Sequence, residues 1–269
     1  YATGFVGTDA TEESITVYVN NLNDNSPVIT SSNTFYPVEN QKEIGTVAAT
    51  DADGDTLTYH VLEYTPLYTN PIVIDTNTGE LSFTYDTNFE QTFYYTARIG
   101  VKEYEGQSGY GATQNINIYV TNLNDNSPSF TSSDAFSVDE GINTIGTVEA
   151  TDADGDQVTF SVSGSDVSID SVSGALTFNS APDYESQTSY TFTVTASDGT
   201  NTTDQEITVT INNINDNTPS ITSSSTFSVA EGVSAIGTIT AIDADGDNLT
   251  FSMSSTNSGS NTNNAYPFR

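Results

Sequence analysis

The chain has 269 residues, enough for one large domain or for two to three small ones. Its 36 acidic and 4 basic residues give a formal charge of −32, which repels nucleic-acid backbones and anionic membranes but attracts divalent cations. The absence of cysteine excludes disulfides and thiolate metal sites, and no apolar run reaches the ~18 residues of a membrane span. We therefore expect no nucleic-acid partner and no direct membrane insertion by this segment.

A short polar linker divides the chain into repeats. The sequence LNDNSP begins at Leu22 and again at Leu123, and INDNTP begins at Ile214, so the motif recurs after 101 and then 91 positions. Such polar stretches cannot pack a core and are expected to join domains. The predicted division is a partial repeat at 1–21, complete repeats at 22–122 and 123–213, and a partial repeat at 214–269.

The two end segments both have the pattern of incomplete repeats. A tyrosine precedes an acid by eight positions three times, at Tyr1 and Asp9, Tyr95 and Glu103, and Tyr190 and Asp198. The chain is therefore expected to open in a late strand. Near the other end, 254–266 is a Ser/Asn/Thr-rich insertion relative to the second repeat. We expect a window onto a longer array; a second hypothesis is that the two ends complete each other between copies in a head-to-tail fibre.

Within the repeats, alternation of apolar and polar residues predicts half-buried strands. Val158, Phe160 and Val162 are separated by Thr159 and Ser161, and the same alternation fills 190–196 and 207–211. Gly, Asn, Asp and Ser cluster between such segments at roughly ten-residue intervals, as in an antiparallel sandwich. No helical periodicity is found, so the expected fold class is all-β.

Five motifs in a fixed order resemble those of the cadherin repeat. They are a Glu after the first strand, a DAD pair, a DYE pair, an ASD triplet and the linker NLNDNSP. Apart from the linker, they occur at Glu39, Glu140 and Glu231, at Asp51 and Asp53, Asp152 and Asp154, Asp243 and Asp245, at Asp183 and Glu185, and at Asp198. The similarity covers essentially all 269 residues. It implies a tandem array of Ig-like Greek-key β-sandwiches in an elongated rod.

The resemblance also implies calcium ligands, because in that family acids gather at each junction and hold about three calcium ions. At the first linker the implied ligands are Asn23, Asp24, Asn25, Asp51, Asp53 and Glu103. At the second they are Glu39, Glu90, Asn122, Asn124, Asp125, Asn126, Asp152, Asp154 and Asp198. At the third they are Glu140, Asp183, Glu185, Asn213, Asn215, Asp216, Asn217, Asp243 and Asp245.

Elementary charge chemistry agrees with this assignment. Calcium takes six to eight hard oxygen ligands in flexible geometry, so carboxylates and amide carbonyls from several loops can share one ion. Carboxylates crowded together repel strongly unless a cation neutralises them. The remaining acids, about half of the total, are expected to be plain surface suited to a saline medium.

Some positions depart from the family pattern. The linker opens with Asn122 and Asn213 where the family usually has Asp, and Asn88 replaces the equivalent of Asp183. Each change removes a charged ligand, so weaker calcium binding is predicted at the second linker than at an intact third one. Tryptophan is absent, so strand exchange anchored by an N-terminal Trp has no support.

Several motifs have competing interpretations. DADGD alone is equally a good turn. His60 is the only histidine and lies in a strand pattern, so a catalytic triad is not expected and the chain is predicted not to be an enzyme. Alternating tyrosines are either strand packing or a sugar-stacking surface, namely Tyr94, Tyr95, Tyr104, Tyr110 and Tyr119. Asn201 and Asn248 begin Asn-x-Thr sequons.

The expected function is mechanical. We expect a calcium-rigidified structural or adhesive segment of a long extracellular or cell-surface protein, with calcium, other copies of itself or other surface proteins as partners. The alternative is a set of calcium-stabilised spacer modules in a secreted enzyme or carbohydrate-binding protein.

Overall fold

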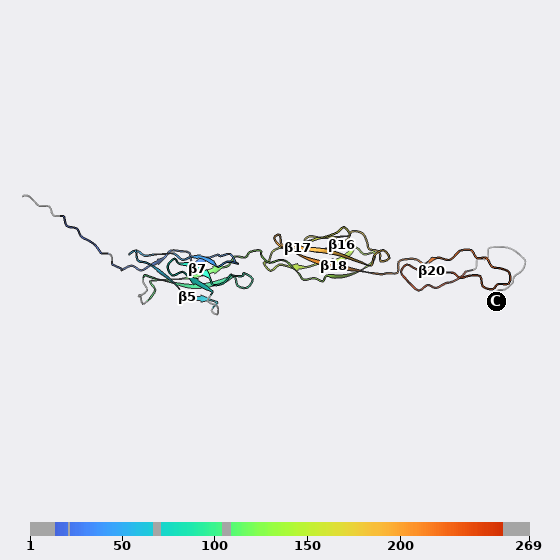
Figure 1. Cartoon of the computed structure of the whole chain (residues 1–269), viewed down its shortest axis with the longest axis horizontal. Coiled ribbons are helices and arrows are strands. Elements are labelled where there is room, and N and C mark those ends of the chain that lie inside the picture. Colours follow the sequence, from blue (N-terminus) through green and yellow to red (C-terminus); the bar gives the residue numbers. More distant parts are fainter. Residues whose placement is uncertain (1–13, 21, 67–70, 104–108, 255–269) are drawn as a thin grey trace, which may run out of the picture. The chain divides into compact units, whose positions relative to one another are not determined.

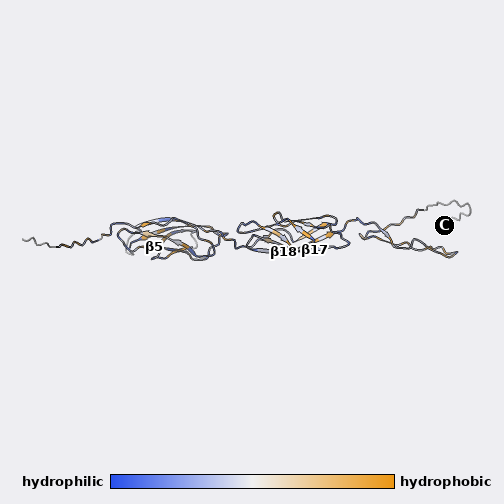
Figure 2. Cartoon of the chain, turned by 90° about the horizontal axis from the view of Figure 1, so that it is seen from above, coloured by the Kyte–Doolittle hydropathy of each residue, from blue (hydrophilic) through white to orange (hydrophobic). Residues whose placement is uncertain are grey.

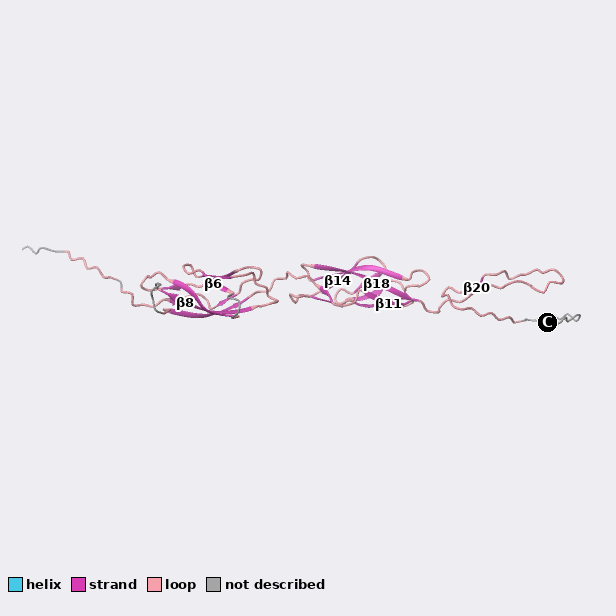
Figure 3. Cartoon of the chain, turned by 60° about the horizontal axis from the view of Figure 1, so that its bottom comes forward, coloured by secondary structure: helices cyan, strands magenta, loops and turns pink. Residues whose placement is uncertain are grey.

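The computed structural model describes residues 14–20, 22–66, 71–103 and 109–254 (Figure 1). These divide into two units, Tyr1–Asp125 and Asn126–Arg269, and each is considered by itself. Some predictions concern residues outside these ranges. They are the spacing of Tyr1 and Asp9, the residues Asn21 and Tyr104, and most of the 254–266 insertion. The described part is all-β: Figure 3 shows strands and loops, with no helix in these ranges, and hence none able to cross a membrane.

The first unit contains nine strands in three sheets. They are β1 (Val28–Ile29), β2 (Thr34–Phe35), β3 (Glu43–Thr46), β4 (Ala49–Thr50), β5 (Thr58–Thr65), β6 (Ile72–Ile74), β7 (Glu80–Phe83), β8 (Tyr94–Lys102) and β9 (Ala112–Tyr119). A four-stranded sheet has the order β2-β9-β8-β5 and a three-stranded sheet the order β3-β7-β6, while β1 pairs with β4. The core between the sheets includes Leu81, Tyr95 and Ile116.

The second unit repeats this topology strand for strand. Its strands are β10 (Ser129–Phe130), β11 (Ala135–Asp139), β12 (Thr144–Thr147), β13 (Ala150–Thr151), β14 (Thr159–Val162), β15 (Val167–Ile169), β16 (Ala175–Phe178), β17 (Ser189–Ser197) and β18 (Thr202–Asn212). The sheet orders are β11-β18-β17-β14 and β12-β16-β15, with β10 paired to β13. Both sandwiches therefore follow one plan, as the sequence repeat predicts.

Alternation decides which residues enter the core. On β17 and β18, Val194, Ala196, Ile207 and Val209 are fully buried, whereas the intervening threonines face outward. The strands predicted at 158–162, 190–196 and 207–211 are thus confirmed. Figure 2 shows hydrophobic residues on the strands of both sandwiches, where the two inner faces meet.

The first strand of each large sheet runs parallel to the last, but over different lengths. In the second unit β11 pairs with β18 over five residues, from Ala135 to Asp139. In the first unit β2 pairs with β9 only at Thr34 and Phe35, followed by an isolated bridge at Val38. Pro37 takes the place of Val138 and has no N–H to donate, so the ladder is interrupted there.

The matched motifs IDTNTGELSF and IDSVSGALTF form a tight turn. The Asp75 carboxylate accepts the N–H groups of Asn77 and Thr78 at 2.9 and 2.8 Å, and these hydrogen bonds lower its pKa, with Thr78 the larger cause. Gly79 has φ of +73°, and a Cβ there would lie 2.2 Å from the Val47 carbonyl oxygen. The turn therefore requires glycine at this position.

The segment after the third linker contains β19 (Ser220–Ile221) and β20 (Ala241–Ile242), which pair antiparallel. Its apolar side chains are exposed, among them Ile236, Phe251 and Met253. At the other end of the chain, residues 14–20 carry no strand and expose Ile15 and Val17. The domain boundaries proposed from the sequence remain predictions.

Candidate metal centre

Each sandwich has a buried glutamate at the end that leads into the following linker. Glu140 is 3 % exposed and accepts two backbone N–H groups, from Tyr184 to Oε2 and from Ile214 to Oε1, both at 2.8 Å. Because Ile214 begins the linker and Tyr184 lies in the DYE loop, this one carboxylate ties both segments to the end of the first strand. Hydrogen bonds to an ionised acceptor are the strong kind, which offsets its burial.

The same arrangement recurs in the first unit. Glu39 is 2 % exposed and accepts the N–H of Phe89 at 2.7 Å and that of Leu123 at 2.8 Å. The loop containing Asn88 thus folds like the DYE loop even though Asn88 replaces Asp183. The repeated glutamate of the sequence is therefore a structural anchor as well as an acid at the edge of the cluster.

Four carboxylates converge in the second unit. Oxygens of Glu140, Glu185, Asp216 and Asp245 all lie within 4.8 Å of one another. They come from the first strand's end, the DYE loop, the linker and the DADGD loop, which are far apart in sequence. Four negative charges at this separation repel one another unless a cation or a proton lies between them.

The pKa values in this cluster reflect that crowding. Desolvation raises the pKa of Asp216, and the nearby charges of Glu140 and Asp245 raise it further. The pKa of Glu185 is raised by desolvation and by the charge of Glu140. In contrast, the pKa of Asp245 is lowered, chiefly by the hydrogen bond from the Asn217 side chain.

The last asparagine of each linker fixes the second aspartate of a DAD pair. Asn217 donates its backbone N–H to Asp245 Oδ2 at 2.8 Å and its side-chain amide to Oδ1 at 3.0 Å. The same pair of hydrogen bonds joins Asn126 to Asp154 and Asn25 to Asp53. At the first linker, hydrogen bonds lower the pKa of Asp53, and the one from the Asn25 backbone N–H contributes most. These asparagines thus act as donors to the acids.

The first aspartate of each DAD pair is presented by a turn. Oδ1 of Asp51 accepts the N–H of Asp53 at 2.8 Å, and Oδ1 of Asp152 accepts that of Asp154 at 2.9 Å. Their Oδ2 atoms are buried and have no hydrogen-bond partner among the residues that the structure describes. A buried carboxylate oxygen left in this state fits a cation ligand, because protein groups do not satisfy it.

The final acid of DADGD belongs to the same clusters, and the sequence reasoning passed over it. Ligand oxygens lie within 4.8 Å of one another in three triplets, namely Asp51, Asp53 and Asp55, then Asp152, Asp154 and Asp156, then Asp243, Asp245 and Asp247. The signal was present in the sequence, since the acids of D-x-D-x-D alternate along one short loop. Three carboxylates on one loop resemble the ligand spacing that calcium loops use.

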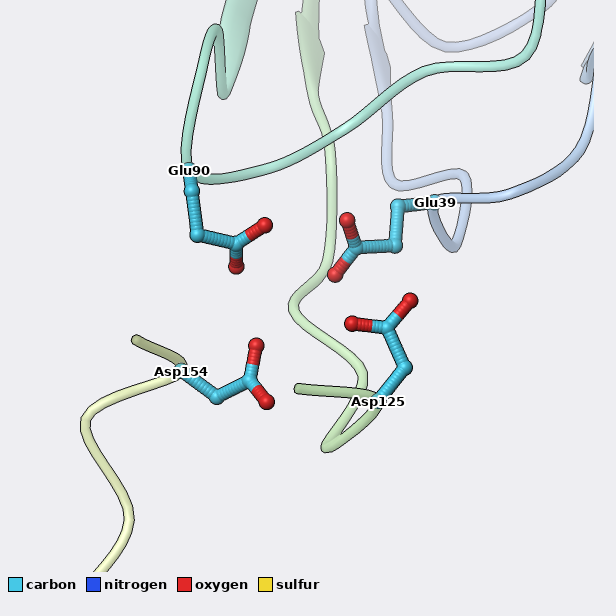
Figure 4. Close-up of side chains that lie close together, drawn as sticks. All are labelled: Glu39, Glu90, Asp125 and Asp154. Carbon is cyan, nitrogen blue, oxygen red and sulfur yellow. The ribbon is translucent and has the colours of Figure 1, made fainter. Parts of the chain in front are cut away.

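The first unit has its own converging set. Oxygens of Glu39, Glu90 and Asp125 lie within 4.8 Å of one another, and Figure 4 shows these three carboxylates facing one another. Asp125 accepts a hydrogen bond from the side-chain amide of Asn40. This donor has no counterpart in the second unit, where Gly141 occupies the equivalent position.

Several other predicted residues lie around these clusters. Asp198 Oδ1 accepts the N–H groups of Thr200 and Asn201 at 2.6 Å, and Asn201 donates to the Asn126 carbonyl at 3.1 Å. Asp183 accepts the Ser186 hydroxyl at 2.9 Å, a hydrogen bond that leads the lowering of its pKa. Since the amide of Asn201 is engaged with the linker, its sequon serves a structural contact.

The remaining predicted residues differ in exposure. Glu103 is 7 % exposed, whereas Asn23 and Asp24 are exposed on the first linker. Asn122 and Asn124 are half-buried, and Asn213 donates to the Asp245 carbonyl at 2.8 Å. Asn215 donates to the Asp247 carboxylate. At each cluster that could hold a metal, the ligand atoms are carboxylate oxygens. Such ligands suit calcium and not zinc or copper.

Comparisons with known proteins identify the repeat. A family model described as "Cadherin domain" matches residues 134–212. Protocadherin gamma-A10 of Pan troglodytes is 31 % identical over 258 residues, covering 86 % of this chain. The chain spans 27 % of that relative's length.

Solved structures give the same result for the fold. The crystal structure of mouse cadherin-23 EC22-24 has a TM-score of 0.70 at 21 % identity, covering 82 % of this chain and 78 % of that one. The protocadherin GammaB4 extracellular domain has a TM-score of 0.66 at 25 % identity, covering 84 % of this chain and 39 % of that one. The chain contains a cadherin repeat over residues 134–212, and along most of its length it is similar to protocadherins and to cadherin ectodomains.

Proposed function

We propose that the acidic clusters bind calcium. Cadherin domains are calcium-binding domains in general, and the observation that carries the proposal for this chain is the set Glu140, Glu185, Asp216 and Asp245. Hard divalent cations that prefer oxygen ligands would neutralise the negative charge of that set. Among them, calcium tolerates the irregular geometry of ligands from four separate loops. Magnesium demands near-octahedral ligands and is the poorer fit.

The chain's own residues would do the positioning. Glu140 already holds the linker and the DYE loop by backbone hydrogen bonds, and Asn217 holds Asp245 of the following loop. A bound calcium ion supplies the positive charge that lets these loops stay together. Without that charge, repulsion among the carboxylates favours their separation, so the linker becomes flexible.

The mechanical role follows from this linkage. We propose that the chain is a calcium-rigidified adhesive or structural segment of a longer protein, and that it contacts other copies of itself or other surface proteins. The chain is extracellular or exposed on the cell surface, as its protocadherin relatives are, and it is not an enzyme, since its family is one of structural and adhesive domains. The alternative role as spacer modules in a secreted enzyme or lectin stays a prediction.

Calcium titration tests the proposal. Isothermal calorimetry on the calcium-free chain is expected to show several sites, with magnesium binding more weakly. Small-angle scattering is expected to show a narrower range of conformations with calcium than with chelator. The matched control is the Asp245→Asn variant, which removes one charge from the cluster and keeps the side-chain shape. Absence of calorimetric binding at millimolar calcium, with scattering unchanged by chelator, would disprove the proposal.

A further inference from the structure

Three tyrosines form a cluster on the outer face of the first unit's large sheet. Tyr94 and Tyr119 are direct cross-strand partners on β8 and β9, with ring centroids 4.9 Å apart. Tyr36, just after β2, stacks on Tyr119 with centroids 5.8 Å apart and planes 20° apart. Tyr36 is 70 % exposed and the other two are each 39 % exposed. We call these three residues the tyrosine platform.

Polar groups continue from the tyrosine platform along the same face. The Tyr94 hydroxyl donates to Asn117 Oδ1 at 2.8 Å. Asn117 also lines a hollow of about 460 Å³, together with Thr96, Arg98, Asn115 and Glu63. Arg98 and Glu63 form an ion pair at 3.6 Å, so the hollow has no net charge from them. An aromatic surface thus adjoins a shallow groove lined by planar hydrogen-bonding groups.

The second unit shows that the fold does not need these rings. Ser137, Ser189 and Thr210 occupy the positions of Tyr36, Tyr94 and Tyr119, in the same strand register. Glu206 and Asp204 replace Asn115 and Thr113. The same sheet therefore forms with serine, threonine and acids on its outer face. Packing of the fold does not account for the tyrosine platform, and exposed aromatic clusters of this kind mark binding sites.

Charge and shape together point to the class of ligand. The outward residues of β8 and β9 include no acid, although the chain as a whole carries −32. An anionic ligand would be repelled by that overall field, and a cationic one would meet a single carboxylate, that of Glu63, which Arg98 already engages. Exposed ring surface packs the apolar C–H groups of a sugar ring, while Asn and Arg groups beside it bind hydroxyls in pairs.

We propose that the tyrosine platform and the adjoining groove bind an uncharged oligosaccharide. The sugar rings contact Tyr36, Tyr94 and Tyr119, and the hydroxyl groups are bound by Asn115, Asn117 and Arg98. The proposal is independent of the calcium clusters, because it rests on the outer face of one sheet within one unit.

Affinity electrophoresis of the full chain in calcium tests this directly. Non-denaturing gels containing mannan, dextran or xyloglucan serve as neutral probes, and gels containing hyaluronate serve as the anionic probe. The wild-type chain is expected to be retarded by at least one neutral polysaccharide and not by hyaluronate. The triple variant Tyr36→Ser, Tyr94→Ser, Tyr119→Thr copies the second unit. Its affinity for the polysaccharide is expected to be at least about tenfold lower than that of the wild type.

Two further variants separate recognition from folding. Tyr18→Ser removes an exposed tyrosine elsewhere and is expected to bind like the wild type. Asn115→Glu keeps all three rings but introduces the acid of the second unit, and is expected to bind several-fold more weakly. Circular dichroism checks that each variant folds.

Three outcomes would overturn the proposal. The first is no retardation of the wild type by any neutral probe. The second is retardation by hyaluronate alone. The third is sedimentation velocity showing that the triple variant has lost self-association while sugar binding is unchanged, which would assign the face to a second copy.

Discussion

In both sandwiches a buried glutamate accepts two backbone N–H groups at the linker end, but the side chains around it differ. Beside Glu39 are Asn88, which carries no charge, and Asn40, whose amide donates to Asp125. Beside Glu140 are the charged Asp183 and Gly141, which has no side-chain donor. The backbone frame is therefore shared, while the charge placed inside it is not.

The difference shows that the backbone hydrogen bonds that hold each loop are independent of the negative charge that a cation must neutralise. Backbone hydrogen bonds hold Glu39 and Glu140 alike, so each loop folds in the same way whether or not Asp is present. Desolvation and nearby charge raise the pKa of Asp216 and Glu185 in the second unit. Asp183 adds a negative charge near Asp216 that Asn88 cannot add in the first unit, which predicts the tighter calcium site in the second unit.

Removal of calcium is expected to have the largest effect. A ligand at a concentration of 100 Kd stabilises the folded state by about 2.7 kcal/mol per site. Chelation is expected to lower the thermal midpoint of the second unit more than that of the first, as measured by calorimetric unfolding of the full chain. Equal shifts in the two units would contradict the comparison.

Substitution of the buried glutamates tests the shared frame. Glu140→Gln places an amide NH₂ against one of the two backbone N–H groups and removes a charged hydrogen bond, at a cost of about 2 kcal/mol in the free energy of unfolding. Glu39→Gln is expected to cost a similar amount. The two variants differ in calcium affinity, which falls further for Glu140→Gln. Urea unfolding with chelator present measures the loss of folding stability alone. Calorimetry with calcium measures the loss of calcium affinity.

Exchange of the charged residue tests the source of the difference. Asp183→Asn is expected to weaken the second site several-fold, about 1 kcal/mol, because one negative charge near Asp216 is lost. Asn88→Asp is expected to strengthen binding in the first unit by a similar factor. Calcium calorimetry on both variants is the measurement. A gain from Asp183→Asn would show that repulsion there already exceeds what the cation can offset.

The smallest effect is expected from the asparagine donor. Gly141→Asn introduces the side chain found at Asn40, and asparagine tolerates the φ of +76° at this position better than other residues. Its amide would bind Asp216 and compete with calcium, weakening the site by about two- to threefold. Asn40→Gly is the reciprocal variant. If calcium affinity is unchanged in both variants, the difference between the two sites comes from Asn88 and Asp183 and not from the asparagine donor.

The sequence predicted the fold class, the alternation of the strands and most of the acids that form the clusters, but not Asp55, Asp156 and Asp247. It could not predict that Glu39 and Glu140 accept backbone N–H groups, because this depends on side-chain direction at a loop end. Nor could it predict that Asn25, Asn126 and Asn217 act as donors, since an amide offers both an oxygen and an NH₂ group.

The tyrosines show the same limit. Tyr95 was included in the hypothetical sugar-stacking surface, but it is 2 % exposed in the core, so that part of the hypothesis was wrong. Neighbouring residues on a strand face opposite sides, which places Tyr94 outside and Tyr95 inside. Tyr110 instead lies beside His60 and Lys102. Tyr36 was missed because its contact with Tyr119 depends on the parallel pairing of β2 with β9.

That parallel pairing also governs how each sandwich responds to tension. When the chain is pulled from its ends, the first and last strands of a sandwich slide past each other, and their hydrogen bonds are loaded in shear together. The ladder of β11 and β18 is continuous over five residues, whereas the ladder after β2 lacks the bond that Pro37 cannot donate and resumes where the Thr121 N–H donates to the Pro37 carbonyl at 2.7 Å. One fewer hydrogen bond carries the shear in the first sandwich, so we expect it to yield at a slightly lower force than the second.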